Sequence, residues 1–355
     1  GVAARRAGRA GARVSSGGRV VAAVASVAGA LALWQIRSVL LLVLGGLLFA
    51  IVFSAATRGV QRLTRWPRRV SFVLTVLALA AASVAVLWWV GGELAAQLRD
   101  LRQQLPGALD SLRQWLAGTA LGSQAIEAID GLQQWEVPWM RLAGAATLTL
   151  GALGNFILML LLGVFIALEP SVYQRGIVRL VPVVHRPRLS AALEAAAAAL
   201  AGWLRGQALS MLFVGVATWV GLALLDVPLA LILGVLAGIL GFIPFFGAIV
   251  SGALAVLLAF TQGPQTALYV ALIALAIQQV EGNLLMPLVQ RWAVQLPPAV
   301  GVVSVVVAGG LFGIGGVLLA TPLVVVLMVL VRKLYVEGLL EGETAPPEDA
   351  EAART

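Results

Sequence analysis

The segment from Asp226 to Met286 constrains the fold more than any other part of the sequence. It is almost entirely apolar, yet the sequence GFIPFFG interrupts it at residues 241–247, and a carboxylate, Glu281, lies near its end. Apolar runs of about 18 or more residues are typical of membrane-spanning helices. Backbone breaks at membrane depth are tolerated only inside protein or beside water. The segment therefore predicts a membrane protein with a pathway through it.

The composition extends this expectation to the whole chain. Hydrophobic residues make up 61% of the sequence and charged residues 11%, whereas soluble domains contain about 25% charged residues. The apolar segments do not alternate with polar residues as the strands of membrane β-barrels do. We predict an all-α polytopic membrane protein with about eight hydrophobic segments, two of them broken or re-entrant, and an amphipathic helical insert.

The positive charge is concentrated in short loops. The net charge is +8, and five arginines lie between residues 58 and 69. Basic loops stay on the cytoplasmic side of a membrane, so we expect a multi-pass protein of the bacterial inner (plasma) membrane with both termini cytoplasmic. We expect the protein to interact with the lipid bilayer and not with nucleic acid. With no cysteine and one histidine, His185, we expect no metal site and no cofactor.

Hydropathy and charge divide the chain into five regions. The N-terminal region is expected to hold three spans, Val20–Trp34, Val39–Ala56 and Val70–Val90, with a tight turn at Arg37 and Ser38. The regions are a basic cytoplasmic arm (1–19), the N-terminal membrane spans (20–90), an amphipathic non-cytoplasmic insert (91–145), a membrane transport core with two broken helical segments (146–336), and an acidic disordered tail (337–355).

The insert has one apolar helical face, because leucines recur at spacings of three and four from Leu94 to Leu116. Two interpretations stay open. The insert is either an amphipathic hairpin that lies on the membrane surface, or an element for subunit contact or gating.

Two broken segments occupy corresponding positions in the second half. Leu229–Phe260 is interrupted by Pro244, and Ala299–Val331 is interrupted by the glycine-rich stretch 309–316. At ~1.5 Å per residue, a helix over Leu229–Phe260 would extend about 48 Å, too long for one crossing of a ~30 Å core and too short for two. A re-entrant hairpin fits this length. Paired interrupted segments are also the best sequence indication of a transporter's binding site.

Glu281 is the first candidate for transport or coupling. A carboxylate within an apolar membrane segment costs ~2.5 to 3.5 kcal/mol on insertion scales and indicates function by default. Gln278 precedes it by one helical turn, and Gln279 and Asn283 form a second pair at i and i+4. The alternative is that Glu281 only pairs with Arg291 near the interface.

The breaks supply the candidate hinge and gate. Glycine and proline there would permit bending, and phenylalanines would close a path; the alternatives are close helix packing at glycine and lipid-facing aromatic rings. The candidates are Gly241, Pro244, Phe245, Phe246, Gly247, Gly313, Gly315 and Gly316.

Three stretches together resemble the autoinducer-2 exporter (AI-2E) family of transporters. They are GFIPFFGAIVSG, QQVEGNLLMPLV and LPPAVGVVSVVVAGGLFGIGGVLLATPLVVVL, within a resemblance over roughly residues 20 to 335. The resemblance implies an inner-membrane secondary transporter that exports a small polar signalling molecule in quorum sensing, with sodium or proton antiport in some members. The chain departs from the family pattern at Ala248, where the family usually has proline.

We therefore expect a homo-oligomeric secondary transporter whose partners are a small polar solute and H⁺ or Na⁺. A cation/proton antiporter, a passive channel and a non-transporting scaffold are the alternatives. An enzyme is not expected. Ser251 has no histidine in the membrane to act as its base, and the chain has no phosphate-binding Gly-Lys-Ser loop.

Overall fold

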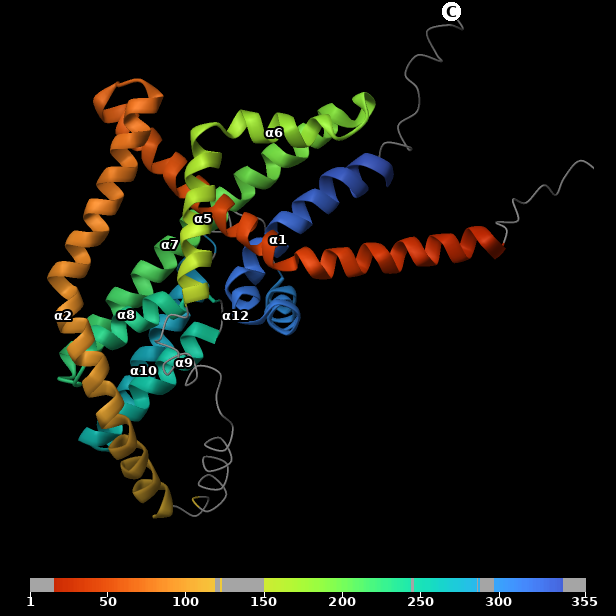
Figure 1. The fold of residues 1–355 in the computed structure, drawn as a ribbon. Helices are drawn as coiled ribbons and strands as arrows, with labels where there is room; N and C mark the ends of the chain where they lie inside the picture. Colours follow the sequence, from red (N-terminus) through yellow and green to blue (C-terminus); the bar gives the residue numbers. More distant parts are fainter. Residues whose placement is uncertain are drawn as a thin grey trace, which may run out of the picture.

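The computed structural model describes residues 16–118, 122, 150–243, 246–285, 287 and 297–340. The secondary structure of this described part is helical, which confirms the all-α prediction (Figure 1). Five of its helices are long and apolar enough to cross a membrane, or six if one bent pair counts as a span. The five candidates are Ser38–Thr64, Arg68–Val86, Val183–Leu224, Pro264–Leu285 and Ala299–Glu337.

Helix α1 (Ser16–Thr64) is continuous, so the predicted tight turn at Arg37 and Ser38 is wrong. Neither glycine nor proline stands at residues 34–38, and arginine and glutamine are good helix formers. A short polar interruption therefore did not end the helix. Its N-terminal part projects away from the rest of the chain, at the right of Figure 1, and its candidate span is Ser38–Thr64.

Pro67 separates the first two long helices. Proline lacks an N–H donor and is tolerated before or in a first helical turn, and Pro67 is the N-cap of helix α2 (Arg68–Ala117). Arg65 adopts a positive φ of 57°, which turns the chain so that α2 runs back past α1. The two arms of this corner carry the arginine cluster that was predicted as a short loop.

Helix α2 continues from the membrane segment through Gly91 and Gly92 into the insert. The first part of the insert and the preceding candidate span therefore belong to one helix. The predicted leucine face is buried in part, since Leu101 packs in a core cluster with Leu233 and Leu258. Gln97 Oε1 accepts a 3.0 Å hydrogen bond from the backbone N–H of Ile232. Most of residues 119–149 lie outside the described part.

Helix α5 (Leu150–Leu168) packs closely on α1, because a Cβ at Gly163 would lie 2.5 Å from the Cβ of Phe49. The chain then bends by 89° into the short helix α6 (Pro170–Arg179), which begins with a proline in its first turn. A 3₁₀ turn, η1 (Val183–His185), leads to helix α7 (Arg186–Leu224). Helix α7 is one long rod, which crosses the molecule diagonally in Figure 1.

The first broken segment forms two short apolar helices, α8 (Ala230–Leu240) and α9 (Phe246–Ala259). They pack against each other, and α8 also lies along α7. The predicted packing role of Gly234 is confirmed, because a Cβ there would lie 2.8 Å from the carbonyl oxygen of Gly215 on α7. A 3₁₀ turn, η2 (Phe260–Gln262), leads into α10 (Pro264–Val280) and a π-helical turn, η3 (Glu281–Leu285).

The second broken segment, α12 (Pro298–Val331), is kinked at Gly313, where φ is 65° and ψ is −148°. Backbone angles of this kind are nearly restricted to glycine. A Cβ at Gly316 would overlap the carbonyl oxygen of Ala308, although eight residues separate these positions by about 12 Å in a straight helix. The chain therefore folds back at Gly313. The last element is the π-helical segment η4 (Arg332–Leu340).

Candidate functional site

One face of α7 organises the candidate site. Trp203, Gln207, Ser210, Val214 and Thr218 recur at spacings of three and four residues, so they line up on one side of the helix. The first two contact the tip of the α8–α9 hairpin, the third contacts α10, and the last two line a cleft. The long α7 rod thus fixes the relative positions of the broken segment and the carboxylate.

The hairpin tip is held to α7 by one aromatic and one polar contact. Trp203, which is buried, meets Phe242 edge to face with 5.7 Å between ring centroids. Gln207 Nε2 donates a 2.6 Å hydrogen bond to the carbonyl oxygen of Gly241. Carbonyls at the end of a helix lack an intrahelical partner, and α8 ends at Leu240. Gln207 therefore satisfies an acceptor that the helix break exposes.

Glu281 is half-buried and lies at the junction between α10 and the π-helical turn. Ser210 Oγ on α7 donates a short hydrogen bond to Glu281 Oε1, and Gln278 Nε2 donates a 3.1 Å bond to Oε2. Both carboxylate oxygens thus accept from side-chain donors. Single π-helical turns frequently occur at functional sites, and here the turn begins at the carboxylate itself.

The structure brings Gln278 to Glu281, but it separates Gln279 and Asn283 from that carboxylate contact. Asn283 Nδ2 donates a 3.0 Å hydrogen bond to Gln279 Oε1, and both side chains are exposed. The four polar residues therefore form the two pairs that their spacing predicted, on α10 and η3. Arg291, the proposed alternative partner of Glu281, lies outside the described residues.

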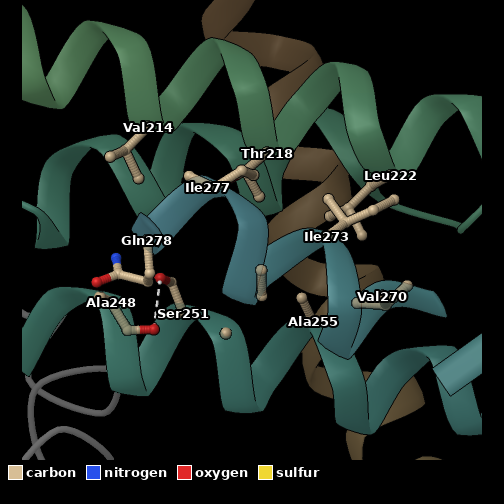
Figure 2. Close-up of a pocket in the computed structure, with 12 residues that line it drawn as sticks. Val214, Thr218, Leu222, Ala248, Ser251, Ala255, Val270, Ile273, Ile277 and Gln278 are labelled. Carbon is tan, nitrogen blue, oxygen red and sulfur yellow. Dashed lines mark hydrogen bonds between the residues drawn. The ribbon is translucent and has the colours of Figure 1, made fainter. Parts of the chain in front are cut away.

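A narrow cleft with a volume of about 30 Å³ lies between α7, α9 and α10. Figure 2 shows its mostly aliphatic lining, with Thr218, Ser251 and Gln278 as the polar side chains. The Ser251 hydroxyl donates to backbone carbonyls of its own helix, at 2.7 Å to Gly247 and 3.4 Å to Ala248. Gln278 both lines the cleft and donates to Glu281, so it connects the cleft to the carboxylate.

The predicted hinge glycines have distinct structural roles. At both hairpin tips one glycine permits a backbone contact: a Cβ at Gly247 would overlap the carbonyl oxygen of Leu240, as one at Gly316 would overlap that of Ala308. Gly313 supplies the positive φ, whereas a Cβ at Gly315 would make only an ordinary contact, 3.7 Å from a methyl group of Leu41. Pro244, Phe245 and the side chain of Phe246 lie outside what the structure describes.

Sequence reasoning did not identify Gln207 and Ser210 as partners of the site. Both are polar residues at the start of an apolar span, three positions apart on one face, and this spacing was an available signal. Their targets are a carbonyl 34 positions away and a carboxylate 71 positions away in the chain. Only the packing of α7 against two other elements reveals those targets.

Comparisons with known proteins identify the family of the chain. The family model described as "AI-2E family transporter" matches residues 23–335. The "Putative transport protein MT0215" of Mycobacterium tuberculosis is 33% identical over 73% of each chain. The "Putative transport protein YueF" of Bacillus subtilis is 25% identical over 86% of this chain and 88% of its own, and the "Putative transport protein YhhT" of Escherichia coli is 28% identical over 78% and 79%. This chain belongs to the AI-2E family of transporters.

Proposed function

We propose that the protein is a secondary transporter that exports a small polar solute across the bacterial inner membrane along a path beside Glu281. The observation that carries the proposal is that α7 contacts both the broken segment and the carboxylate. Gln207 donates a hydrogen bond to the carbonyl oxygen of Gly241, at the end of α8, and Ser210 donates one to Glu281, at the end of α10. Broken helices beside a polar group at membrane depth are the usual construction of a transporter's binding site.

The lengths of α8 and α9 support a re-entrant hairpin. Their 11 and 14 residues correspond to about 16 and 21 Å of helix, and a bilayer core is about 30 Å thick. Neither helix crosses the core alone, and a hairpin of the two places its tip within the membrane. Gly241, Gly247 and Gln207 then lie where an unsatisfied backbone group would be costly, unless protein or water surrounds it.

A carboxylate with two donors suits coupling to H⁺ or Na⁺. Hydrogen bonds to an ionised acceptor are roughly twice as strong as those between neutral groups. When Glu281 takes up a proton or coordinates a cation, the bonds from Ser210 and Gln278 weaken, and α10 is less firmly tied to α7. The cleft between α7, α9 and α10 would then widen for a solute, with Thr218, Ser251 and Gln278 as its polar contacts.

Flux through purified protein in liposomes tests this proposal. Wild type and Glu281→Gln are compared under imposed proton or sodium gradients, with internal pH and a labelled polar signalling molecule followed together. We expect gradient-dependent flux of the labelled molecule in the wild type and its loss in the variant. Asp226→Asn is the matched control, because it also neutralises one carboxylate and its left-handed φ of 53° suits asparagine.

Equal flux in wild type and Glu281→Gln would remove Glu281 from the mechanism and favour a passive channel. Glu281-dependent cation exchange that needs no organic solute would favour the cation/proton antiporter. Absence of flux in correctly folded protein would favour the scaffold. The proposal further assigns cytoplasmic positions to both termini, a non-cytoplasmic position to residues 91–145 and a homo-oligomeric state. Single introduced cysteines can report these positions, because the native chain has none.

A further inference from the structure

A second and larger cavity lies apart from the residues of the candidate site, beside the corner between α1 and α2. Its volume is about 580 Å³, and α1, α2, the end of α5, and α7 line it. We name it the arginine cavity, after the two cationic side chains in its lining, Arg58 and Arg68. Among the described residues that line it there is no carboxylate.

The α1 wall of the arginine cavity changes steadily from apolar to polar. Leu47, Ile51, Ser54, Arg58 and Gln61 follow one another at spacings of four and three residues, so they form one stripe along the helix. At ~1.5 Å per residue the stripe extends about 21 Å. An elongated ligand with an apolar part and a polar end matches this gradient, whereas a small uniformly polar ion does not.

The opposite walls complete an amphipathic enclosure. Phe72, Ile166 and Ala167 are apolar, and α7 contributes three alanines, Ala197, Ala198 and Ala201. The alanines leave open the space that larger side chains would fill. Arg68 is positioned at this wall because its Nη2 donates a 3.2 Å hydrogen bond to the carbonyl oxygen of Ala167. That bond uses one of the five N–H donors of a guanidinium.

The surroundings of the cavity are strongly basic. Arg62, Arg65 and Arg69 lie on the same corner, and none of the five arginines there forms a salt bridge with another residue that the structure describes. Two carboxylates are near in sequence to the lining. Glu194, one turn before Ala197, accepts hydrogen bonds from Gln174 and Ser190, and Glu169 precedes Pro170 as the N-cap of α6.

We propose that the arginine cavity binds an anionic membrane phospholipid. Its phosphate lies at Arg58 and Arg68, and an acyl chain follows Leu47 and Ile51. Basic pockets between helices on the cytoplasmic side of a membrane suit anionic headgroups, and guanidinium groups match phosphate geometry. The apolar half of the stripe distinguishes a lipid from free phosphate. The site is independent of the transport path through Glu281, since the two share no lining residue.

Native mass spectrometry of the full chain in detergent tests the proposal with three probes: phosphatidylglycerol, phosphatidylcholine and inorganic phosphate. The test variant is Arg58→Gln with Arg68→Gln. The matched control is Arg62→Gln with Arg69→Gln, which removes the same charge outside the cavity lining. We expect phosphatidylglycerol to bind the wild type and control alike, and the test variant about thirtyfold more weakly, which corresponds to about 1 kcal/mol for each arginine.

Ala198→Phe supplies a second variant that keeps every charge and fills the cavity, so a folding defect in the arginine variant would not leave the question open. We expect it to reduce phosphatidylglycerol binding with the elution volume of the protein unchanged. Three results would overturn the proposal: equal loss in the test and control pairs, unchanged binding in both the arginine variant and Ala198→Phe, or displacement of the lipid by inorganic phosphate. Glu281-dependent flux is measured separately, so the proposed function stands or fails on its own result.

Discussion

The two broken segments share the same close backbone contact at a glycine, but this contact lies in different surroundings. In both, a glycine after the tip lies against a carbonyl oxygen of the preceding arm: Gly247 against Leu240, and Gly316 against Ala308. The tip of the α8–α9 hairpin is tied to α7 through a side-chain hydrogen bond from Gln207. The second arm of α12 instead carries fully buried apolar residues, including Ala320 and Val325.

This difference separates the feature that makes a hairpin from the features that make a site. Both hairpins form through a close approach of backbone to glycine. Polar contacts that can form and break distinguish the first hairpin. Its tip accepts a hydrogen bond from Gln207, which lies one turn before Ser210, the donor to Glu281, on α7. The second hairpin packs in an apolar cluster with Leu44 and Leu200, a cluster that Phe242 of the first tip also contacts. We infer that the α8–α9 tip moves during transport against a frame that α12, α1 and α7 provide.

The largest expected effect is on folding, and it is common to both hairpins. Gly247→Val and Gly316→Val each force a side chain onto a backbone carbonyl, so we expect each to lower the free energy of unfolding by about 3 kcal/mol or more. Thermal unfolding in detergent measures this effect. Gly154→Val on α5, where an added Cβ meets nothing within 4 Å, controls for the presence of valine. Wild-type stability of either variant would contradict the claim that both hairpins need glycine at this backbone contact.

The next largest expected effect is a loss of solute flux, and it concerns only the first hairpin. Gln207→Leu leaves the Gly241 carbonyl without its 2.6 Å donor, and an unsatisfied buried group costs about 1–3 kcal/mol. We expect solute flux in liposomes to fall about tenfold, which corresponds to about 1.4 kcal/mol in a rate barrier. Ser304→Ala is the counterpart on α12, where the hydroxyl bonds only within its own turn. Equal losses in the two variants would remove the distinction between the hairpins.

The smallest expected effect concerns the exposed pair beyond the site. Asn283→Ala removes a 3.0 Å hydrogen bond to Gln279 between two exposed side chains. Substitutions of this kind change stability by less than about 0.5 kcal/mol, so we expect flux and the melting temperature to stay near their wild-type values. A loss of flux comparable with that of Glu281→Gln would show that the transport path includes this pair, against the arrangement described here.

Local chemistry explains which parts of the fold could be predicted from the sequence. The end of α1 near Pro67, the bend at Glu169-Pro170 and the breaks at glycine depend on residues that act on their own backbone. Arg37 and Ser38 misled the prediction because a polar pair lowers hydropathy without breaking a helix. Gly91 and Gly92 did not stop α2 for a related reason, since isolated glycine weakens a helix by only about 1 kcal/mol.

The candidate site was predictable only in part. Glu281 and Gln278 stand out because polar groups are rare in apolar segments, and their spacing places them one turn apart on a helix. The i, i+4 spacing also predicted Gln279 and Asn283 as a second pair. Their exposure depends on which side of α10 faces α7, and the sequence of α10 does not specify its neighbour. Gln207 and Ser210 became visible as partners only when the register between α7, α8 and α10 was known.

The most direct test of the central claim is to fix the hairpin tip to α7 and measure transport. Trp203→Cys with Phe242→Cys replaces the two rings that meet at 5.7 Å, and no native cysteine competes. We expect flux to stop when a short bifunctional thiol reagent with a reducible link joins the pair, and to return on reduction, while each single variant remains active. Full flux through the crosslinked protein would contradict the claim that the α8–α9 tip moves during transport.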